Sequence, residues 1–330
     1  MSVTKLNVFV VHVESYHYRK VTCERLRDLL EKDPRFAVNF KYITEHDPQN
    51  VTQEEVRRYI NYDPIKEEPL SAFNVLLKNL HVNHLSNSLK HLDALTLAAE
   101  AADDEVSIVL EDDIVFNDGI LDALDAALKN LPPAYDVVML GLPSSKEASG
   151  LKYQKTDALF KVLPACDSYL VTKRAAKTLS EGFTPIKYTN NVQLSYLMAK
   201  HELSSFLVIP NIFIDGSKLG LYYSTLEVNN RLIFNQDFIQ LSKLIHETTD
   251  FTAEKKKEIN KLFLDVKLKT NPEFYYLKAL FESKTGNHVF AKAIFDYTYD
   301  LYEHNGTILN NQSTFLRDYM REFKHLQTVA

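Results

Sequence analysis

Short apolar, β-branched runs alternate along the first two thirds of the chain with longer stretches of helical periodicity. Residues 6–13 are a short apolar run, residues 18–32 repeat apolar side chains at helical spacing, and residues 36–43 alternate apolar with polar positions. This order predicts a βαβ unit, which builds a parallel sheet covered by helices. Further strands are predicted at 106–110, 137–140, 159–162, 169–172 and 206–209, and further helices at 69–102, 120–128, 174–179 and 192–201.

The strand signals stop after about residue 223. The remaining apolar patterns predict only helices, at 238–245, 253–263, 272–283, 289–302 and 314–326. We therefore predict an α/β domain over residues 1–225 and a helical region over residues 226–330. Residues 272–302, with Gly286 between two helical patterns, resemble a single tetratricopeptide-type hairpin. One copy cannot form a solenoid, so we expect this region to pack on the first domain, bind a partner or mediate homodimerisation.

Composition narrows the class of protein. The 330 residues are 45% hydrophobic and carry a net charge of -6, which argues against general binding of nucleic acid. The two cysteines, Cys23 and Cys166, form no disulfide framework, which favours a reducing compartment. No segment has the ~18 apolar residues of a membrane span, and the first residues lack the apolar core of a secretory signal. We expect a cytoplasmic protein without a membrane span.

The strongest chemical signal is an acidic triplet inside an apolar segment. Residues 108–116 read IVLEDDIVF, so Glu111, Asp112 and Asp113 follow a buried strand directly. Ligands of open α/β sheets bind at the carboxyl ends of the strands. Adjacent carboxylates repel one another, and a divalent cation such as Mg²⁺ or Mn²⁺ removes that cost. The alternative is that the acids cap the next helix or face solvent, but the apolar flanks on both sides disfavour it.

The triplet resembles the LEDD motif of glycosyltransferase family 25, the lipopolysaccharide and collagen galactosyltransferase group, which has the GT-A fold. Other segments are similar to that family in the same order. They are the first strand followed by Arg19, LSNSLKHLDAL at 85–95, DSYLVTKRAAKTL at 167–179 and PNIFIDGSKLG at 210–220. The resemblance spans about residues 5–225. It implies a GT-A-type nucleotide-sugar-binding, Rossmann-like mixed sheet flanked by helices.

The resemblance also implies an activity. A member of this family transfers a sugar from a nucleotide donor, usually UDP-linked, with inversion, to a hydroxyl acceptor on a glycan, glycolipid or protein. Asp113 would be the main ligand of Mn²⁺ or Mg²⁺. Glu111 would face the nucleotide ribose or a metal-bound water and is the second candidate metal ligand, and Asp112 would help to bind the donor. The chemistry is consistent, because a divalent cation stabilises the charge on a departing nucleoside diphosphate.

An inverting transferase needs a general base for the acceptor hydroxyl. The family often has an aspartate at the start of the helix near residues 189–194, where this chain has Asn190 and Asn191. A glycine of the family is also replaced in the segment Cys166-Asp167-Ser168. Asp167 and Asp215 remain as candidate bases, and Asp215 is equally a candidate metal ligand.

Four other residues are candidates for binding the donor phosphates. Arg19 follows the first strand and is either a bidentate diphosphate ligand or a surface arginine. His91 is either a phosphate contact or a histidine on the helix surface. Ser217 and Lys218 lie in a glycine-containing loop that either approaches phosphate closely or is an ordinary turn.

Two other functions remain open. A nucleotidyltransferase also uses acids at a strand end, but it usually has a glycine-rich phosphate loop near the N-terminus, and residues 1–118 contain no glycine. A catalytically inactive scaffold is favoured by the Asn190-Asn191 departure and disfavoured by the intact acidic triplet.

Overall fold

The computed structural model describes residues 3–77, 80–116, 118–141, 150–157, 162–217, 236–265 and 272–294. The chain divides into two compact units. The first comprises Met1–Val13, Leu26–Ile114 and Gly119–Asp215, and the second comprises Glu14–Arg25, Val115–Asp118 and Gly216–Ala330. The boundary predicted near residue 225 lies outside the described residues and stays a prediction.

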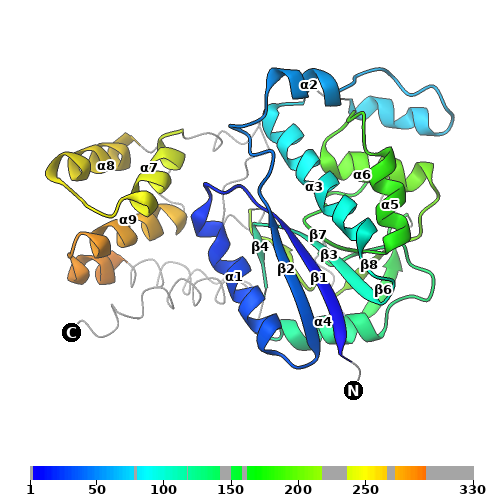
Figure 1. Ribbon diagram of the computed structural model, residues 1–330, viewed down its shortest axis with the longest axis horizontal. Coiled ribbons are helices and arrows are strands. Elements are labelled where there is room, and N and C mark those ends of the chain that lie inside the picture. The colour runs from blue at the N-terminus through cyan, green and yellow to red at the C-terminus, as the bar shows by residue number, and fades with distance from the viewer. Residues whose placement is uncertain are drawn as a thin grey trace. The chain divides into compact units, whose positions relative to one another are not determined.

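A seven-stranded mixed sheet forms the centre of the first unit (Figure 1). Its strands are β1 (Thr4–Val11), β2 (Phe36–Ile43), β3 (Glu105–Glu111), β5 (Val137–Met139), β6 (Lys152–Lys155), β7 (Ser168–Val171) and β8 (Ser205–Ile209). Two further short strands, β4 (Ile114–Val115) and β9 (Ile214–Asp215), pair with each other.

The strand order β2-β1-β3-β7-β5-β8-β6 determines which strand ends meet. β1 is parallel to β2 and β3, and β5 is parallel to β8. β7 is antiparallel to both β3 and β5, so its amino end lies at the same edge of the sheet as their carboxyl ends. The ends of β1, β3, β5 and β8 and the start of β7 therefore converge at one edge.

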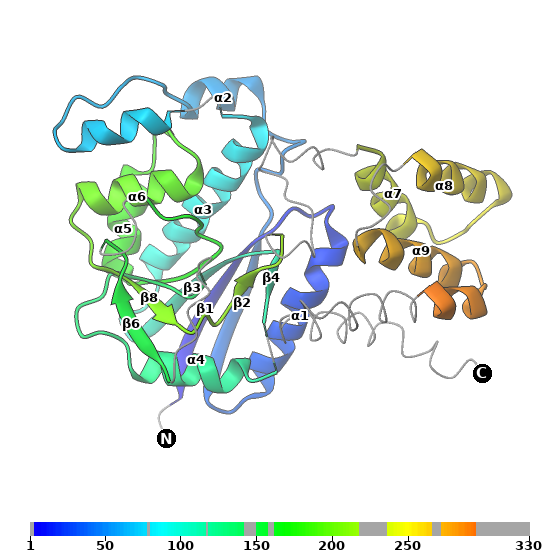
Figure 2. The same cartoon turned by 180° about the vertical axis from the view of Figure 1, so that it is seen from behind.

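Helices cover both faces of this sheet (Figures 1 and 2). α3, α5 and α6 pack against one another on one face, and α4 lies on the other. α3 buries a periodic apolar stripe that includes Leu85, Leu89 and Leu95. The helices are α1 (His17–Lys32), α2 (Gln53–Tyr59), α3 (Val82–Glu100), α4 (Ile120–Lys129), α5 (Lys173–Gly182) and α6 (Asn190–Lys200), with a 3₁₀ helix η1 (Leu70–Leu76).

The predicted mixed α/β fold with flanking helices is confirmed and is consistent with a GT-A-type arrangement. The single helix predicted over 69–102 is wrong, because the chain forms η1 and α3 with a break between them. The helix α2 and the strands β4, β6 and β9 were not predicted, since short elements carry too few residues for a clear period. Most of the strand predicted at 159–162 lies outside the described residues.

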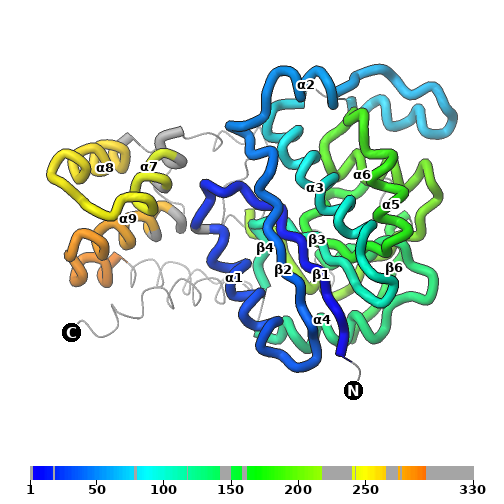
Figure 3. Tube along the Cα trace, viewed as in Figure 1, coloured from blue at the N-terminus to red at the C-terminus, as the bar shows by residue number. Residues whose placement is uncertain are grey.

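The second unit contains α7 (Gln236–Glu247), α8 (Ala253–Asp265) and α9 (Pro272–Lys284), whose path can be followed in Figure 3. The Phe263 ring contacts the rings of Phe274 and Phe281, with centroids 5.6 and 5.8 Å apart, so these aromatic residues form a small core. After α9, Gly286 at φ 87° makes the turn into a helical segment at 288–294. The rest of the helix predicted at 289–302 lies outside the described residues, and the tetratricopeptide-type hairpin stays a prediction. The helix predicted at 314–326 lies outside the described residues. Homodimerisation through this region stays a prediction.

None of the helices in the described ranges combines the length and the apolar character that are needed to cross a lipid bilayer.

Candidate functional site

The acidic triplet lies at the edge where the strand ends converge. Glu111 is the last residue of β3, and Asp112 and Asp113 form the turn after it. The parallel register pairs Val11 with Glu111, so the residue after β1, His12, comes beside Asp112. Carboxyl ends of parallel strands are where α/β proteins bind ligands.

Asp112 is held inside the protein by groups at the end of β1. The residue is 4% exposed, and Oδ2 accepts hydrogen bonds from Nδ1 of His12 at 2.8 Å and from the backbone N–H of Val13 at 3.3 Å. His12 is fully buried. These bonds give Asp112 a structural role, because they tie the turn after β3 to the end of β1. Its predicted role in donor binding stays a prediction.

A buried ion pair between Lys90 and Asp47 also holds the end of β1 in place. The ammonium group of Lys90, on α3, donates to the carboxylate of Asp47 and to the backbone carbonyl of His12. Both side chains are almost completely buried, at 1% and 2% exposure. Removing either partner would leave a buried charge, so this pair locks α3, the segment after β2 and the end of β1 together.

Glu111 points toward α3. Its Oε1 accepts hydrogen bonds from Nδ2 of Asn87 and from Nε2 of His91, both at 3.1 Å. Asn87 and His91 are four residues apart and therefore lie on one helix face. The other carboxylate oxygen, Oε2, has no hydrogen-bond partner in the described part of the chain, and the side chain is 18% exposed. Glu111 can therefore still present one oxygen to a ligand.

His91 is fully buried, which excludes the interpretation as a histidine on the helix surface. Its Nδ1 is 3.0 Å from the hydroxyl of Tyr169, and the two rings stack with centroids 5.9 Å apart. Burial, with nearby Cys166 and Glu111, raises the pKa of the Tyr169 hydroxyl well above 10.0. The neutral hydroxyl donates to Nδ1 when His91 carries its proton on Nε2, and Nε2 then donates to the Glu111 carboxylate, which only accepts. The contact of His91 with donor phosphate stays a prediction.

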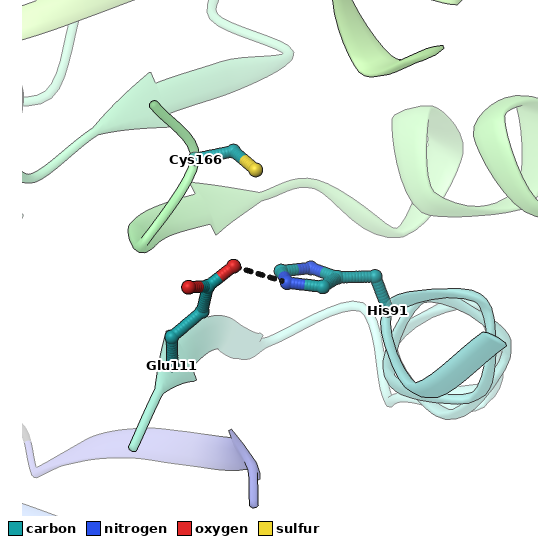
Figure 4. A group of neighbouring side chains, drawn as sticks. All are labelled: His91, Glu111 and Cys166. Carbon is teal, nitrogen blue, oxygen red and sulfur yellow. Dashed lines mark hydrogen bonds and ion pairs between the residues drawn. The ribbon is translucent and has the colours of Figure 1, made fainter. Parts of the chain in front are cut away.

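Cys166 forms a cluster with His91 and Glu111 (Figure 4). One donor atom from each of His91, Glu111 and Cys166 lies within 4.8 Å of the other two. Nδ2 of Asn190, at the start of α6, donates to Sγ of Cys166 at 2.9 Å. A nitrogen, an oxygen and a sulfur donor thus lie close together, which makes the cluster a candidate metal site.

The two candidate bases differ in exposure. Asp167 is buried, and its backbone carbonyl accepts the N–H of Glu111 at 2.7 Å. Asp215 is half-buried and lies in β9, which pairs with β4 just after the triplet.

Gly141, after β5, allows the segment that leads to β9 to pass close by, because a Cβ atom at this position would lie 2.3 Å from the carbonyl oxygen of Phe213. Glycine is therefore needed where these segments pass.

Three of the candidates for phosphate binding lie outside the described part of the first unit. Arg19 belongs to the second unit, where its guanidinium lies over the ring of Tyr16, 5.0 Å from the centroid. Ser217 also belongs to the second unit. Lys218 lies outside the described residues. The roles of all three in donor binding stay predictions.

No protein-family model matches the chain, and no curated protein sequence matches it either. Among solved structures, the chain is similar to the crystal structure of mouse xyloside xylosyltransferase 1 in its apo form, with 10% sequence identity and a TM-score of 0.31. The similarity covers 61% of this chain and 82% of that chain. The resemblance to glycosyltransferase family 25 therefore has no support from a family model, and the function must be inferred from the chain's own residues.

Several residues of the site were missed by sequence reasoning. His12 was detectable in principle, because it follows β1 as Asp112 follows β3. Asn87 was detectable from its spacing of four residues to His91. Cys166 and Asn190 were noted only as departures from the family pattern and Tyr169 only as part of a strand, because their proximity to Glu111 depends on the antiparallel insertion of β7 between β3 and β5.

Proposed function

We propose that this protein is a metal-dependent glycosyltransferase. It would transfer a sugar from a nucleotide donor, with UDP favoured, to a hydroxyl group of a glycan, glycolipid or protein, with inversion. The observation that carries the proposal is the acidic turn Glu111–Asp113 at the edge where the strand ends converge. Asp112 braces the turn through His12 and Val13, and Glu111 and Asp113 are the proposed ligands of the ion.

These two carboxylates suit Mn²⁺ or Mg²⁺. Such ions take oxygen ligands and are typically bound by one or two carboxylates together with phosphate oxygens. Glu111 has an oxygen that no described residue occupies, and Asp113 stands two positions further along the same turn. Glu111 and Asp113 would hold the ion, which supplies positive charge to stabilise the departing nucleoside diphosphate.

The general base must reach an acceptor hydroxyl, directly or through one water. The half-buried Asp215 is better placed for this than the buried Asp167. We therefore assign the base to Asp215. Asp215→Asn should abolish turnover while donor binding remains, and Asp167→Asn should leave turnover measurable. The reverse result would move the base to Asp167.

The test of the function is thermal stabilisation of the full chain by a panel of nucleotide sugars, with Mn²⁺ or with EDTA. A donor at 100 times its Kd should stabilise the folded state by about 2.7 kcal/mol. The stabilisation should require the metal and be lost in Asp113→Ala. Asp103→Ala is the matched control, because Asp103 is an exposed carboxylate that precedes the other end of β3.

Each other outcome has a definite meaning. Stabilisation without metal would keep a nucleotide-sugar site and remove the triplet from metal binding. Loss in both variants would show that the effect of Asp113→Ala is unspecific. If no donor stabilises the protein, the transferase proposal fails and an inactive scaffold becomes the better explanation.

A further inference from the structure

We propose that His91, Glu111 and Cys166 form a binding site for a divalent transition metal of the zinc class. This site differs in chemistry from the Mn²⁺ or Mg²⁺ position proposed at Glu111 and Asp113, and it does not depend on glycosyl transfer. It is built from three elements of the first unit, namely α3, the end of β3 and the segment before β7.

The donor set selects the metal. Imidazole nitrogen, carboxylate oxygen and cysteine sulfur are the three ligand types that Zn²⁺ takes in proteins, whereas Mg²⁺ prefers oxygen alone. In a tetrahedral zinc site, neighbouring donor atoms are roughly 3.4–3.6 Å apart. Nε2 of His91 and Oε1 of Glu111 are already 3.1 Å apart, and all three donor atoms lie within 4.8 Å. Small rotations of these side chains, which move the donor atoms by about 1 Å, would bring all three donors to the separations of a tetrahedral site.

Each of the three donors already has a partner that orients it. Tyr169 contacts Nδ1 of His91, Asn87 donates to Glu111, and Asn190 donates to the sulfur of Cys166. Metal sites typically have such a surrounding layer, which fixes the ligands and tunes their basicity.

The His91–Tyr169 bond is compatible with both the metal-free and the metal-bound state. Without metal, Nε2–H donates to Glu111 and Nδ1 accepts from Tyr169. With metal, Nε2 is a ligand, the proton resides on Nδ1, and Nδ1–H donates to the Tyr169 oxygen, because a hydroxyl is both donor and acceptor. Cys166 binds as the thiolate, so one proton is released to solvent for each ion bound.

The fourth position of the metal is left for water or an exogenous ligand. Oδ1 of Asn190 is buried and has no hydrogen-bond partner among the described residues. This oxygen belongs to the amide that contacts Cys166, so it can accept a hydrogen bond from a metal-bound water. Glu111 is the most exposed of the three ligands and marks the side from which an ion enters.

The site shares Glu111 with the proposed donor-binding ion. Occupation by Zn²⁺ would therefore weaken the Mn²⁺-dependent binding of a nucleotide sugar.

Cobalt(II) is the probe for the first test, since it replaces zinc and gives a thiolate-to-cobalt charge-transfer absorption. The full chain is reduced, stripped of metal and titrated with Co²⁺ in the absence of nucleotide. We expect the band to saturate at one equivalent and Zn²⁺ to remove it. The band should be lost in Cys166→Ser and retained in Cys23→Ser, the matched control, because Cys23 is the other buried free cysteine. Tyr169→Phe should weaken Co²⁺ binding by about 10–100-fold.

A second measurement needs no variant and covers the case in which Cys166→Ser does not fold. In the unmodified protein, Zn²⁺ should slow alkylation of Cys166, read by peptide mass spectrometry, and leave the alkylation rate of Cys23 unchanged. Absence of the band in the unmodified protein, its survival in folded Cys166→Ser, or equal protection of both cysteines would overturn the proposal. Asp113→Ala should keep the cobalt band while it loses donor stabilisation, which separates failure of this site from failure of the transferase proposal.

Discussion

Replacing Asp112 with alanine tests whether the acidic triplet has one structural member. The substitution removes the oxygen that accepts both Nδ1 of His12 and the N–H of Val13. His12 is completely buried and Asp112 is 4% exposed, so water cannot easily replace the lost acceptor. Both donors would remain unsatisfied at the end of β1.

The expected cost follows from these two bonds. A hydrogen bond to a charged group contributes about 1.5–3 kcal/mol, and the longer backbone bond to Val13 contributes about 1 kcal/mol. Asp112→Ala should therefore lower the free energy of unfolding by about 2.5–4 kcal/mol. Asp112→Asn should cost only about 1–2 kcal/mol, because an amide oxygen in the same place accepts both bonds without the charge.

Urea unfolding followed by far-ultraviolet circular dichroism is the suitable assay, since the chain has no tryptophan. The variants are compared over the transition of the first unit, and Asp112→Asn should retain metal-dependent donor stabilisation. A loss below about 1 kcal/mol in Asp112→Ala, or an equal loss in both variants, would refute the structural role of this carboxylate.

Three further predictions concern the packing of the first unit, with Lys5→Met as the control for the first of them. Lys90→Met should destabilise the protein by about 3–5 kcal/mol in the same urea assay, and Lys5→Met, at an exposed ion pair, by about 0–1 kcal/mol. Gly141→Ala should cost about 1–3 kcal/mol and reduce turnover, because the new methyl group displaces the segment that leads to Asp215. Tyr153 donates to a backbone carbonyl on α4, and burial raises its pKa to about 12. Its folded-state pKa exceeds the unfolded value of 10.0, so stability should fall as pH rises from about 10 to about 12, and Tyr153→Phe should reduce that fall.

The local patterns were sufficient for the main elements of the first unit. The apolar runs located β1, β3, β5, β7 and β8 to within a few residues, because a strand that is buried on both faces of a sheet carries apolar side chains on both. The alternating pattern located β2, which lies at the edge of the sheet. The same patterns located α3, α5 and α6, although not the break before α3. The position of Glu111–Asp113 directly after a strand was also evident from the sequence alone. The three carboxylates interrupt an apolar segment, and charged side chains are found at the end of a buried strand rather than inside it.

What the triplet touches was decided by the tertiary structure. His12 and Asp112 are 100 residues apart and meet only because β1 and β3 are parallel neighbours in one register. Cys166 reaches His91 and Glu111 because β7 enters the sheet in the antiparallel direction beside β3. A hydrophobic pattern tells which face of an element is buried, but it carries no information on which strand pairs with which. The sequence by itself therefore determined that an acidic strand end exists, and only strand pairing decided that one acid braces the turn while another joins a histidine and a cysteine.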